Sequence, residues 1–237
     1  MPVIPAEADP TDHRLTRFVR TFAFGARTVA RSFARVRIEG LDRIPGPGGG
    51  PLILAPNHAS NADPVVVGAW ITPILGRRIH WFAKREVLGW PLLGWAGRIG
   101  GIHGIERGTA DVEGFRTAMK VLETGGVLLM FAEGTRSPTG ALKEAKPGLA
   151  TLAIRSGATI VPIAVCGSHR AWPKGGLPRI GRLIRVRVGQ PFRAAEVVPF
   201  GTPRRDAKDV VTHELMARIA SLLPPEQRGA YPSSEVG

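Results

Sequence analysis

The chain has 237 residues and 43% hydrophobic content, which suits one well-buried domain and is short for two. Its 32 Lys and Arg exceed its 19 Asp and Glu, giving a formal net charge of +13, so we expect an anionic partner: nucleic acid, anionic lipid or a phosphorylated substrate. The single cysteine, Cys166, excludes an internal disulfide, and no uncharged run approaches the roughly 20 residues that span a bilayer. A membrane-spanning protein is therefore not expected, nor is a secretory signal, because the first residues lack a basic region followed by an apolar core.

The first part of the chain predicts a basic amphipathic helix between flexible and folded segments. Residues 1–13 are polar and rich in proline, and residues 225–237 are also polar. Both ends are therefore predicted to be flexible. Residues 14–38 carry apolar side chains at helical spacing together with seven arginines. This composition is typical of a helix lying in a membrane interface, and equally of a helix packed on a domain with a solvated basic face. We assign 14–43 to this membrane-associating segment and 44–224 to the main domain.

The main domain predicts an α/β fold with a largely parallel central sheet flanked by helices. Short apolar runs predict strands at 51–55, 79–83, 126–131, 159–165 and 183–188. Helical patterns occur at 109–123, opening at Thr109, at 147–156 and at 203–223. Alternation of strands and helices favours a parallel sheet, and chemistry in such sheets gathers beyond the carboxyl ends of the strands.

Two polar clusters follow the first and third predicted strands, and we expect them to share one crevice. In "NHASNADP", His58 comes directly after the strand, and a tight turn can bring Asp63 back to its imidazole. Such a pair fixes one tautomer and leaves the other ring nitrogen to accept a proton. By itself the spacing also fits a helix-capping Asp63 beside a structural histidine. A metal site is not expected, because no third ligand accompanies the pair.

The second cluster, "FAEGTRSPTG" at 131–140, offers a glycine turn and an arginine. Successive backbone amides and the planar guanidinium of Arg136 suit a phosphate or a carboxylate. A surface ion pair between Glu133 and Arg136 is the structural alternative.

Taken together, the boxes resemble the glycerolipid acyltransferases typified by 1-acyl-sn-glycerol-3-phosphate acyltransferase. "NHASNADP" resembles the NHxxxxD box of that family and "FAEGTRS" its FPEGTRS box, with Ala132 in place of the usual proline. "GGIHGIERG" at 100–108, "IVPIAV" at 160–165 and "KPGLATLA" from Lys146 resemble three further blocks. The resemblance covers about residues 50–190.

The resemblance implies transfer of a fatty acyl chain from acyl-CoA or acyl carrier protein to the free hydroxyl of 1-acylglycerol 3-phosphate. The product would be phosphatidic acid, and no cofactor or metal is implied beyond the acyl donor. His58 would be the general base and Asp63 would orient it. The acceptor phosphate would be bound by Arg107, Glu133, Gly134, Thr135 and Arg136, with further substrate or donor contacts at Asn57, Lys84 and Lys146. Ser60 and Cys166 are rejected as nucleophiles, since Ser60 sits inside the turn and Cys166 ends a buried strand with no nearby base.

A membrane partner fits both the arginine-rich helix and residues 87–97, which are uncharged and include Trp90 and Trp95. The alternative for 87–97 is an ordinary core helix starting at Pro91. We expect a peripheral or monotopic protein on the cytoplasmic face of the cell inner membrane, binding an anionic lipid surface and no nucleic acid.

Three other functions remain open from the sequence. The same chemistry could act on glycerol 3-phosphate, another lysophospholipid or a glycolipid. A hydrolase could use the same histidine on water, although no G-x-S-x-G elbow occurs. A basic nucleic-acid-binding protein would explain the charge, but it predicts aromatics interleaved with basic residues, which we do not find.

Overall fold

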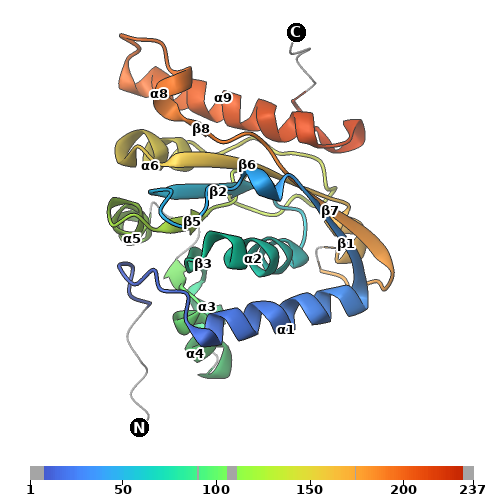
Figure 1. Cartoon of the computed structure of the whole chain (residues 1–237). Helices are drawn as coiled ribbons and strands as arrows, with labels where there is room; N and C mark the ends of the chain where they lie inside the picture. The colour runs from blue at the N-terminus through green and yellow to red at the C-terminus, as the bar shows by residue number, and fades with distance from the viewer. Residues whose placement is uncertain (1–7, 90, 106–110, 174, 232–237) are drawn as a thin grey trace.

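A computed structural model describes residues 8–89, 91–105, 111–173 and 175–231. Within these residues, eight strands form one sheet (Figure 1). Seven of them lie in the order β1-β7-β6-β2-β5-β3-β4, and β8 pairs with β6 beside β7. Their bounds are β1 Ala34–Glu39, β2 Leu52–Pro56, β3 Ile79–Lys84, β4 Ile102–Ile105, β5 Val127–Leu129, β6 Thr159–Cys166, β7 Arg182–Val188 and β8 Phe192–Arg193.

The sheet is mostly parallel, which confirms the predicted fold class. β6, β2, β5, β3 and β4 all run in one direction, whereas β7 and β8 are antiparallel to β6. Every residue of β2 and β5 is buried, as expected of central strands covered on both faces. The carboxyl ends of β2 and β5 therefore lie at the same edge of the sheet, where the two polar clusters were predicted to meet.

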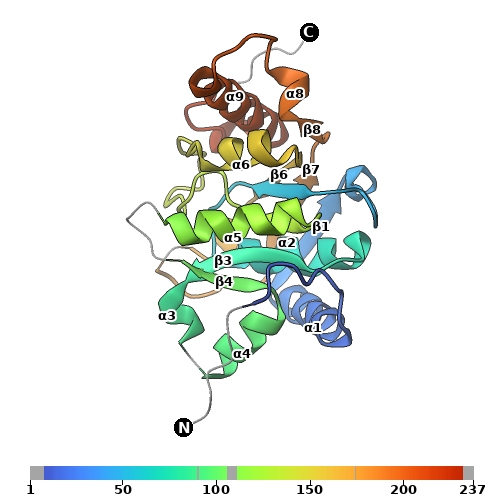
Figure 2. The same ribbon diagram turned by 90° about the vertical axis from the view of Figure 1, so that its left-hand side faces the viewer.

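Helices cover both faces of the sheet (Figures 1 and 2). Alternate strand residues point to opposite sides, so Ile53 and Leu128 pack with the first group of helices, and Leu52 and Val127 with the second. The first group is α5 Val112–Glu123, α6 Gly148–Ser156 and α9 Arg204–Leu222, and the second is α2 Ala62–Leu75 with α1 Arg17–Phe33 outside it. The remaining short elements are η1 Leu41–Arg43, α3 Arg85–Leu88, α4 Pro91–Ile99, α7 Ser168–Ala171, α8 Ala194–Val197 and η2 Pro225–Gln227.

The predicted helix over residues 14–38 is wrong at its end. Helix α1 stops at Phe33, and β1 follows at once, paired in parallel with β7. In β1 the basic and apolar residues alternate, with Arg35 and Arg37 exposed, which is the two-residue period of a strand. The segment 14–43 thus supplies an edge strand of the sheet, and the predicted boundary at 43/44 does not separate it from the main domain.

Part of the basic face of α1 packs on the domain. The Arg27 guanidinium donates to the carbonyls of Ala69 and Trp70 at 2.8 and 3.2 Å, and Arg31 lies over the Trp70 ring. Four apolar side chains of α1 remain at least 47% exposed: Phe22, Phe24, Val29 and Phe33. Among the described residues, no helix is long and apolar enough to cross a membrane.

Both ends that were predicted to be flexible contain packed residues. Near the N-terminus, Ala8 is buried, and Nδ1 of His13 lies 3.1 Å from Nε2 of His80. Near the C-terminus, Gln227 is buried and bonds the backbone of Gly140 and Gly167. These contacts tie the segments at 8–13 and 225–231 to the domain.

A row of three histidines crosses the β3–β4 side of the sheet. His80 Nδ1 lies 3.0 Å from His103 Nε2, and the other end of the row, His13, contacts Thr124. Burial lowers the pKa of His80 to about 3 and that of His103 to about 4. The neutral imidazoles therefore join the N-terminal segment to β3 and β4 by hydrogen bonds.

Candidate active site

The turn after β2 brings His58 and Asp63 together. His58 Nδ1 donates to Asp63 Oδ2 at 2.9 Å, and the backbone amides of Ala59 and Ser60 donate to the same oxygen at 2.7 Å each. Asp63 is fully buried and lies in the first turn of α2, where the helix dipole favours a negative charge. The carboxylate thus fixes the Nδ1–H tautomer of His58 and leaves Nε2 with a free lone pair.

Three further contacts hold the His58 residue in place. Its ring stacks on Phe131 with the centroids 3.8 Å apart and an angle of 17° between the planes. The Asn57 side chain pairs with the backbone of Val165 in β6, accepting at 2.6 Å and donating at 3.2 Å. The carbonyl of His58 accepts from the amide of Ser137 at 2.7 Å. The backbone and ring of His58 are therefore held by β6, through Asn57, and by the segment that follows β5.

Glu133 does not face the site as a phosphate ligand, which corrects the prediction. It is only 3% exposed, and its two oxygens accept from the backbone amides of His58 at 2.8 Å and Lys143 at 3.0 Å. Burial raises the pKa of Glu133 to about 7, against the lowering effect of the two amides. The alternative of a Glu133–Arg136 surface pair is also wrong, because Arg136 bonds Asn61 instead. Glu133 positions the backbone of His58.

The rest of the 131–140 loop surrounds a left-handed turn at Gly134. The φ angle of this glycine is 68°, and a Cβ at this position would come within 3.1 Å of the Lys146 side chain. Lys143 Nζ donates to Thr135 Oγ1 at 2.8 Å, and Arg136 Nη1 donates to Asn61 Oδ1 at 2.6 Å. Because Asn61 is neutral, the charge of Arg136 is left for an anion at this point of the loop.

His58 and Arg136 line one cavity of about 570 Å³. Asn61 and Gly134 also border it, so the two predicted clusters share a crevice. The remaining lining is mostly apolar and comes from both faces of the sheet edge and from α5 and α6; it includes Trp81, Phe82, Phe115, Met130 and Leu152. A polar corner beside a long apolar wall suits an amphiphilic ligand.

The other predicted contact residues are Arg107, Lys84, Lys146 and Asn57, and the structure describes all of them except Arg107. Arg107 lies outside the described residues, as does Thr109. Lys84 is the last residue of β3, at the carboxyl edge of the sheet. Lys146 is exposed beside Gly134, whereas Asn57 is buried and its amide is occupied by Val165.

Neither rejected nucleophile has the surroundings of one. Ser60 is fully buried, and its hydroxyl donates to the carbonyl of Trp172 at 2.7 Å. Burial raises the pKa of the Cys166 thiol to about 11, which disfavours the reactive thiolate. Within the described residues, no group of three or more His, Cys, Asp or Glu could hold a metal ion.

Sequence reasoning missed Phe131 and Lys143 as parts of this site. Phe131 opens the quoted "FAEGTRS" stretch, but no local pattern tells that its ring lies parallel to an imidazole 73 residues earlier in the chain. Lys143 could have been suspected only from its charge close to the glycine turn.

Comparisons with known proteins agree with the architecture. The family model described as Acyltransferase matches residues 35–166. The chain is 28% identical over 192 residues to the chloroplastic 1-acyl-sn-glycerol-3-phosphate acyltransferase LPAT1 of Arabidopsis thaliana, covering 79% of this chain and 49% of that protein. It is 27% identical to the 1-acyl-sn-glycerol-3-phosphate acyltransferase of Pseudomonas aeruginosa, covering 85% of this chain and 76% of that protein.

A third relative and one solved structure also resemble the chain. The lyso-ornithine lipid O-acyltransferase of Pseudomonas aeruginosa is 29% identical, covering 74% of this chain and 62% of that protein. The crystal structure of the 1-acyl-sn-glycerophosphate acyltransferase PlsC from Thermotoga maritima matches with a TM-score of 0.64 at 22% identity, covering 83% of this chain and 76% of that one. Against the first curated relatives, the chain spans less than half of their length.

Proposed function

The chain belongs to the acyltransferase family, and from this membership and the geometry of the site we propose that it transfers a fatty acyl chain from a thioester donor to the free hydroxyl of 1-acylglycerol 3-phosphate. The observation that carries the proposal is the His58–Asp63 pair, because His58 lines the same cavity as Arg136. The names of several relatives support the phosphate-bearing acceptor.

In the proposed reaction, His58 Nε2 takes the proton of the acceptor hydroxyl while that oxygen attacks the thioester carbonyl. A new C–O bond forms, the C–S bond breaks, and the departing thiolate takes the proton back from the imidazolium. Asp63, already bonded to Nδ1, stabilises the positive ring between these steps. No acyl-enzyme is needed, since the thioester is reactive and orientation in the cavity supplies much of the rate.

Replacing His58 tests the base directly. General-base assistance contributes roughly 10²- to 10⁴-fold, so His58→Ala should reduce turnover by about that factor while leaving the fold intact. Product analysis by mass spectrometry with lysophosphatidate and acyl-CoA measures it. His213→Ala, which changes an exposed histidine of α9, is the matched control. Undiminished phosphatidate formation by His58→Ala would overturn the mechanism.

Arg136 is proposed to bind the acceptor phosphate. Arg136 is half-buried at the cavity, and within the described residues its side-chain partner is the neutral amide of Asn61. Arg136→Ala should raise the KM for lysophosphatidate about tenfold and leave the KM for monoacylglycerol unchanged. An equal effect on both acceptors would mean that Arg136 only supports the loop. A panel that adds glycerol 3-phosphate and lyso-ornithine lipid tests the acceptor, the latter because of the similarity to a lyso-ornithine lipid acyltransferase.

Because the proposed acceptor is a membrane lipid, we propose that the protein binds a lipid surface. The binding surface would be formed by α1 and by the loop after α7. This loop, residues 172–181 apart from the undescribed residue 174, is called the Leu177 loop. It exposes 84% of Leu177 and 75% of Ile180, and the sequence has no acid between Glu144 and Glu196. Such exposed aliphatic side chains in basic surroundings suit an anionic bilayer.

The Leu177 loop is tied both to the site and to α1. The carbonyl of Trp172 accepts from Ser60 Oγ in the His58 turn, and the amide of Gly181 donates to the carbonyl of Phe33 at the end of α1 at 2.8 Å. The Leu177 loop therefore meets the end of α1, where Phe33 is exposed, at the carboxyl edge of the sheet. We propose a peripheral or monotopic position on the cytoplasmic face of the inner membrane, with lysophospholipid entering from the bilayer.

A further inference from the structure

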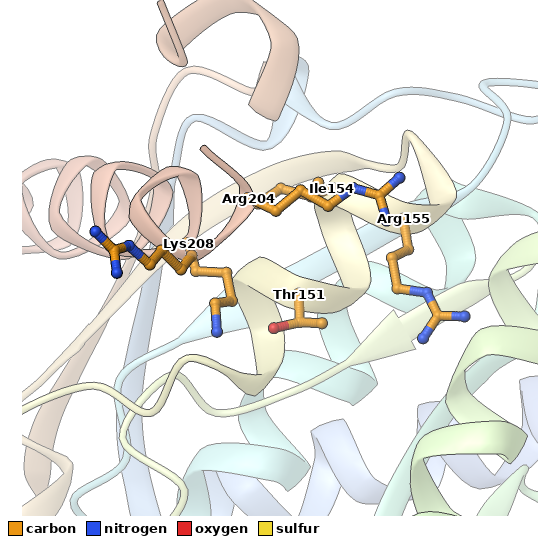
Figure 3. A pocket seen from close by; sticks show the side chains of 6 residues that line it. Thr151, Ile154, Arg155, Arg204 and Lys208 are labelled. Carbon is orange, nitrogen blue, oxygen red and sulfur yellow. The ribbon is translucent and has the colours of Figure 1, made fainter. Parts of the chain in front are cut away.

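A second cavity, of about 600 Å³, lies between α6 and α9, and four of its six lining residues are cationic (Figure 3). α9 contributes Arg204, Arg205 and Lys208, and α6 contributes Thr151, Ile154 and Arg155. Figure 3 shows the side chains of Lys208 and Arg155 on either side of Thr151. None of the residues that line this basic pocket lines the His58 cavity.

The charges of the basic pocket are largely unneutralised. Arg205 forms an ion pair with Asp206 at 3.1 Å. In the described part of the chain, Arg204, Lys208 and Arg155 form no ion pair, although Arg155 lies over the Phe115 ring at 5.6 Å. The first turn of α9 lies at the same place, and the helix dipole adds positive potential there. A concave surface with this field attracts a small ligand that carries several phosphates.

The basic pocket adjoins the His58 cavity through α6 and α5. Thr151 lines the pocket, whereas its neighbour Leu152 lines the His58 cavity. The Phe115 ring on which Arg155 lies is also part of the cavity wall. A ligand bound at the pocket therefore has only this layer of side chains between itself and the apolar wall of the active site.

We propose that the basic pocket binds the phosphorylated nucleotide end of coenzyme A, with the pantetheine arm running past Phe115 to the His58 cavity. This inference rests on the proposed function and specifies its donor. The concave shape favours a nucleotide over a carrier protein, which would need a flat contact surface. Ile154 offers an apolar contact and Arg155 a planar one for the adenine ring, while Arg204 and Lys208 bind phosphate.

Acyl-CoA and acyl-pantetheine carry the same reacting thioester, and only acyl-CoA carries the nucleotide. Comparing them therefore distinguishes nucleotide binding from an effect on the reaction itself. In Arg204→Ala/Lys208→Ala, the KM for acyl-CoA should rise at least tenfold with kcat unchanged, and the KM for acyl-pantetheine, which lacks the nucleotide, should stay the same. The matched control is Arg116→Ala/Lys120→Ala, which removes an exposed Arg and Lys at the same spacing from α5. It should alter neither constant.

Binding of adenosine 3′,5′-bisphosphate, measured by calorimetry, gives a readout that needs no turnover. We expect binding by the wild type and the control and at least tenfold weaker binding by the Arg204/Lys208 variant, even if the transferase assay fails for every acceptor. Equal binding by all three proteins, or equal KM changes for both donors, would overturn the proposal. A KM increase confined to acyl carrier protein would overturn it as well, because the pocket would then receive a protein.

Discussion

The Leu177 loop gives the most direct test of membrane docking. We consider Leu177→Ser/Ile180→Ser. Because the two side chains are already 84% and 75% exposed in the folded protein, their loss should change the free energy of unfolding by no more than about 0.5 kcal/mol. Any large effect must therefore come from the surface that the loop contacts.

The expected loss of binding follows from the apolar area. Removing a Leu or Ile side chain from water contributes about 1.5 kcal/mol at the lower end, so the pair contributes about 3 kcal/mol if both enter the bilayer. Since 1.4 kcal/mol is a factor of ten, partitioning onto liposomes should weaken about 100-fold. Sedimentation with vesicles containing anionic lipid measures this, and salt should weaken the remaining, electrostatic part.

Phe200→Ser is the matched control for the loop. Phe200 is fully exposed in the turn between α8 and α9, and β8 before it pairs with the start of β6, whereas the Leu177 loop follows the end of β6. The control should sediment like the wild type. Equal loss of binding in both variants, or none in the loop variant, would refute the placement of the lipid surface at this edge.

Two further predictions concern the loop around Glu133. Burial raises the pKa of Glu133 from 4.5 to about 7, so its stabilising contribution is complete below pH 4.5 and is lost as the pH rises to about 7. In urea unfolding, the wild type should therefore lose about 3 kcal/mol relative to Glu133→Gln across that range, and a constant difference would contradict the buried carboxyl. Gly134→Ala and Gly125→Ala both place alanine at a positive φ and should each cost about 1–2 kcal/mol in thermal unfolding. Only the change at Gly134, which borders the cavity, should also lower kcat; equal kcat values would contradict its role there.

The central layers of the fold were predictable because their periodicities are strong. The apolar runs of β2 and β6 are long enough to identify a buried strand, and helix α5 begins at Val112, close to the predicted start, with Asp111 as its cap. β1 was missed because its alternation continues an arginine-rich helical pattern without a break. β4 and β8, of four and two residues, are too short to show a period.

At the site, the sequence indicated which residues gather but not which way they point. The His58–Asp63 contact is local, and a five-residue turn constrains it. The orientation of Glu133 depends on an amide 75 residues away, so the EGTR spacing carries no information about it. The same holds for the Leu177 loop, whose ends are fixed by contacts to Ser60 and Phe33.

Helix α1 continues into β1 with no residue between Phe33 and Ala34. A helix joined to a sheet in this way has no linker before the strand, and Arg27 and Arg31 bind it to α2 at Ala69 and Trp70. Once α1 settles at a lipid surface, the tilt of the whole catalytic domain is set with it. The enzyme would then bind the bilayer in a single orientation, with the opening of the cavity already facing the lipid.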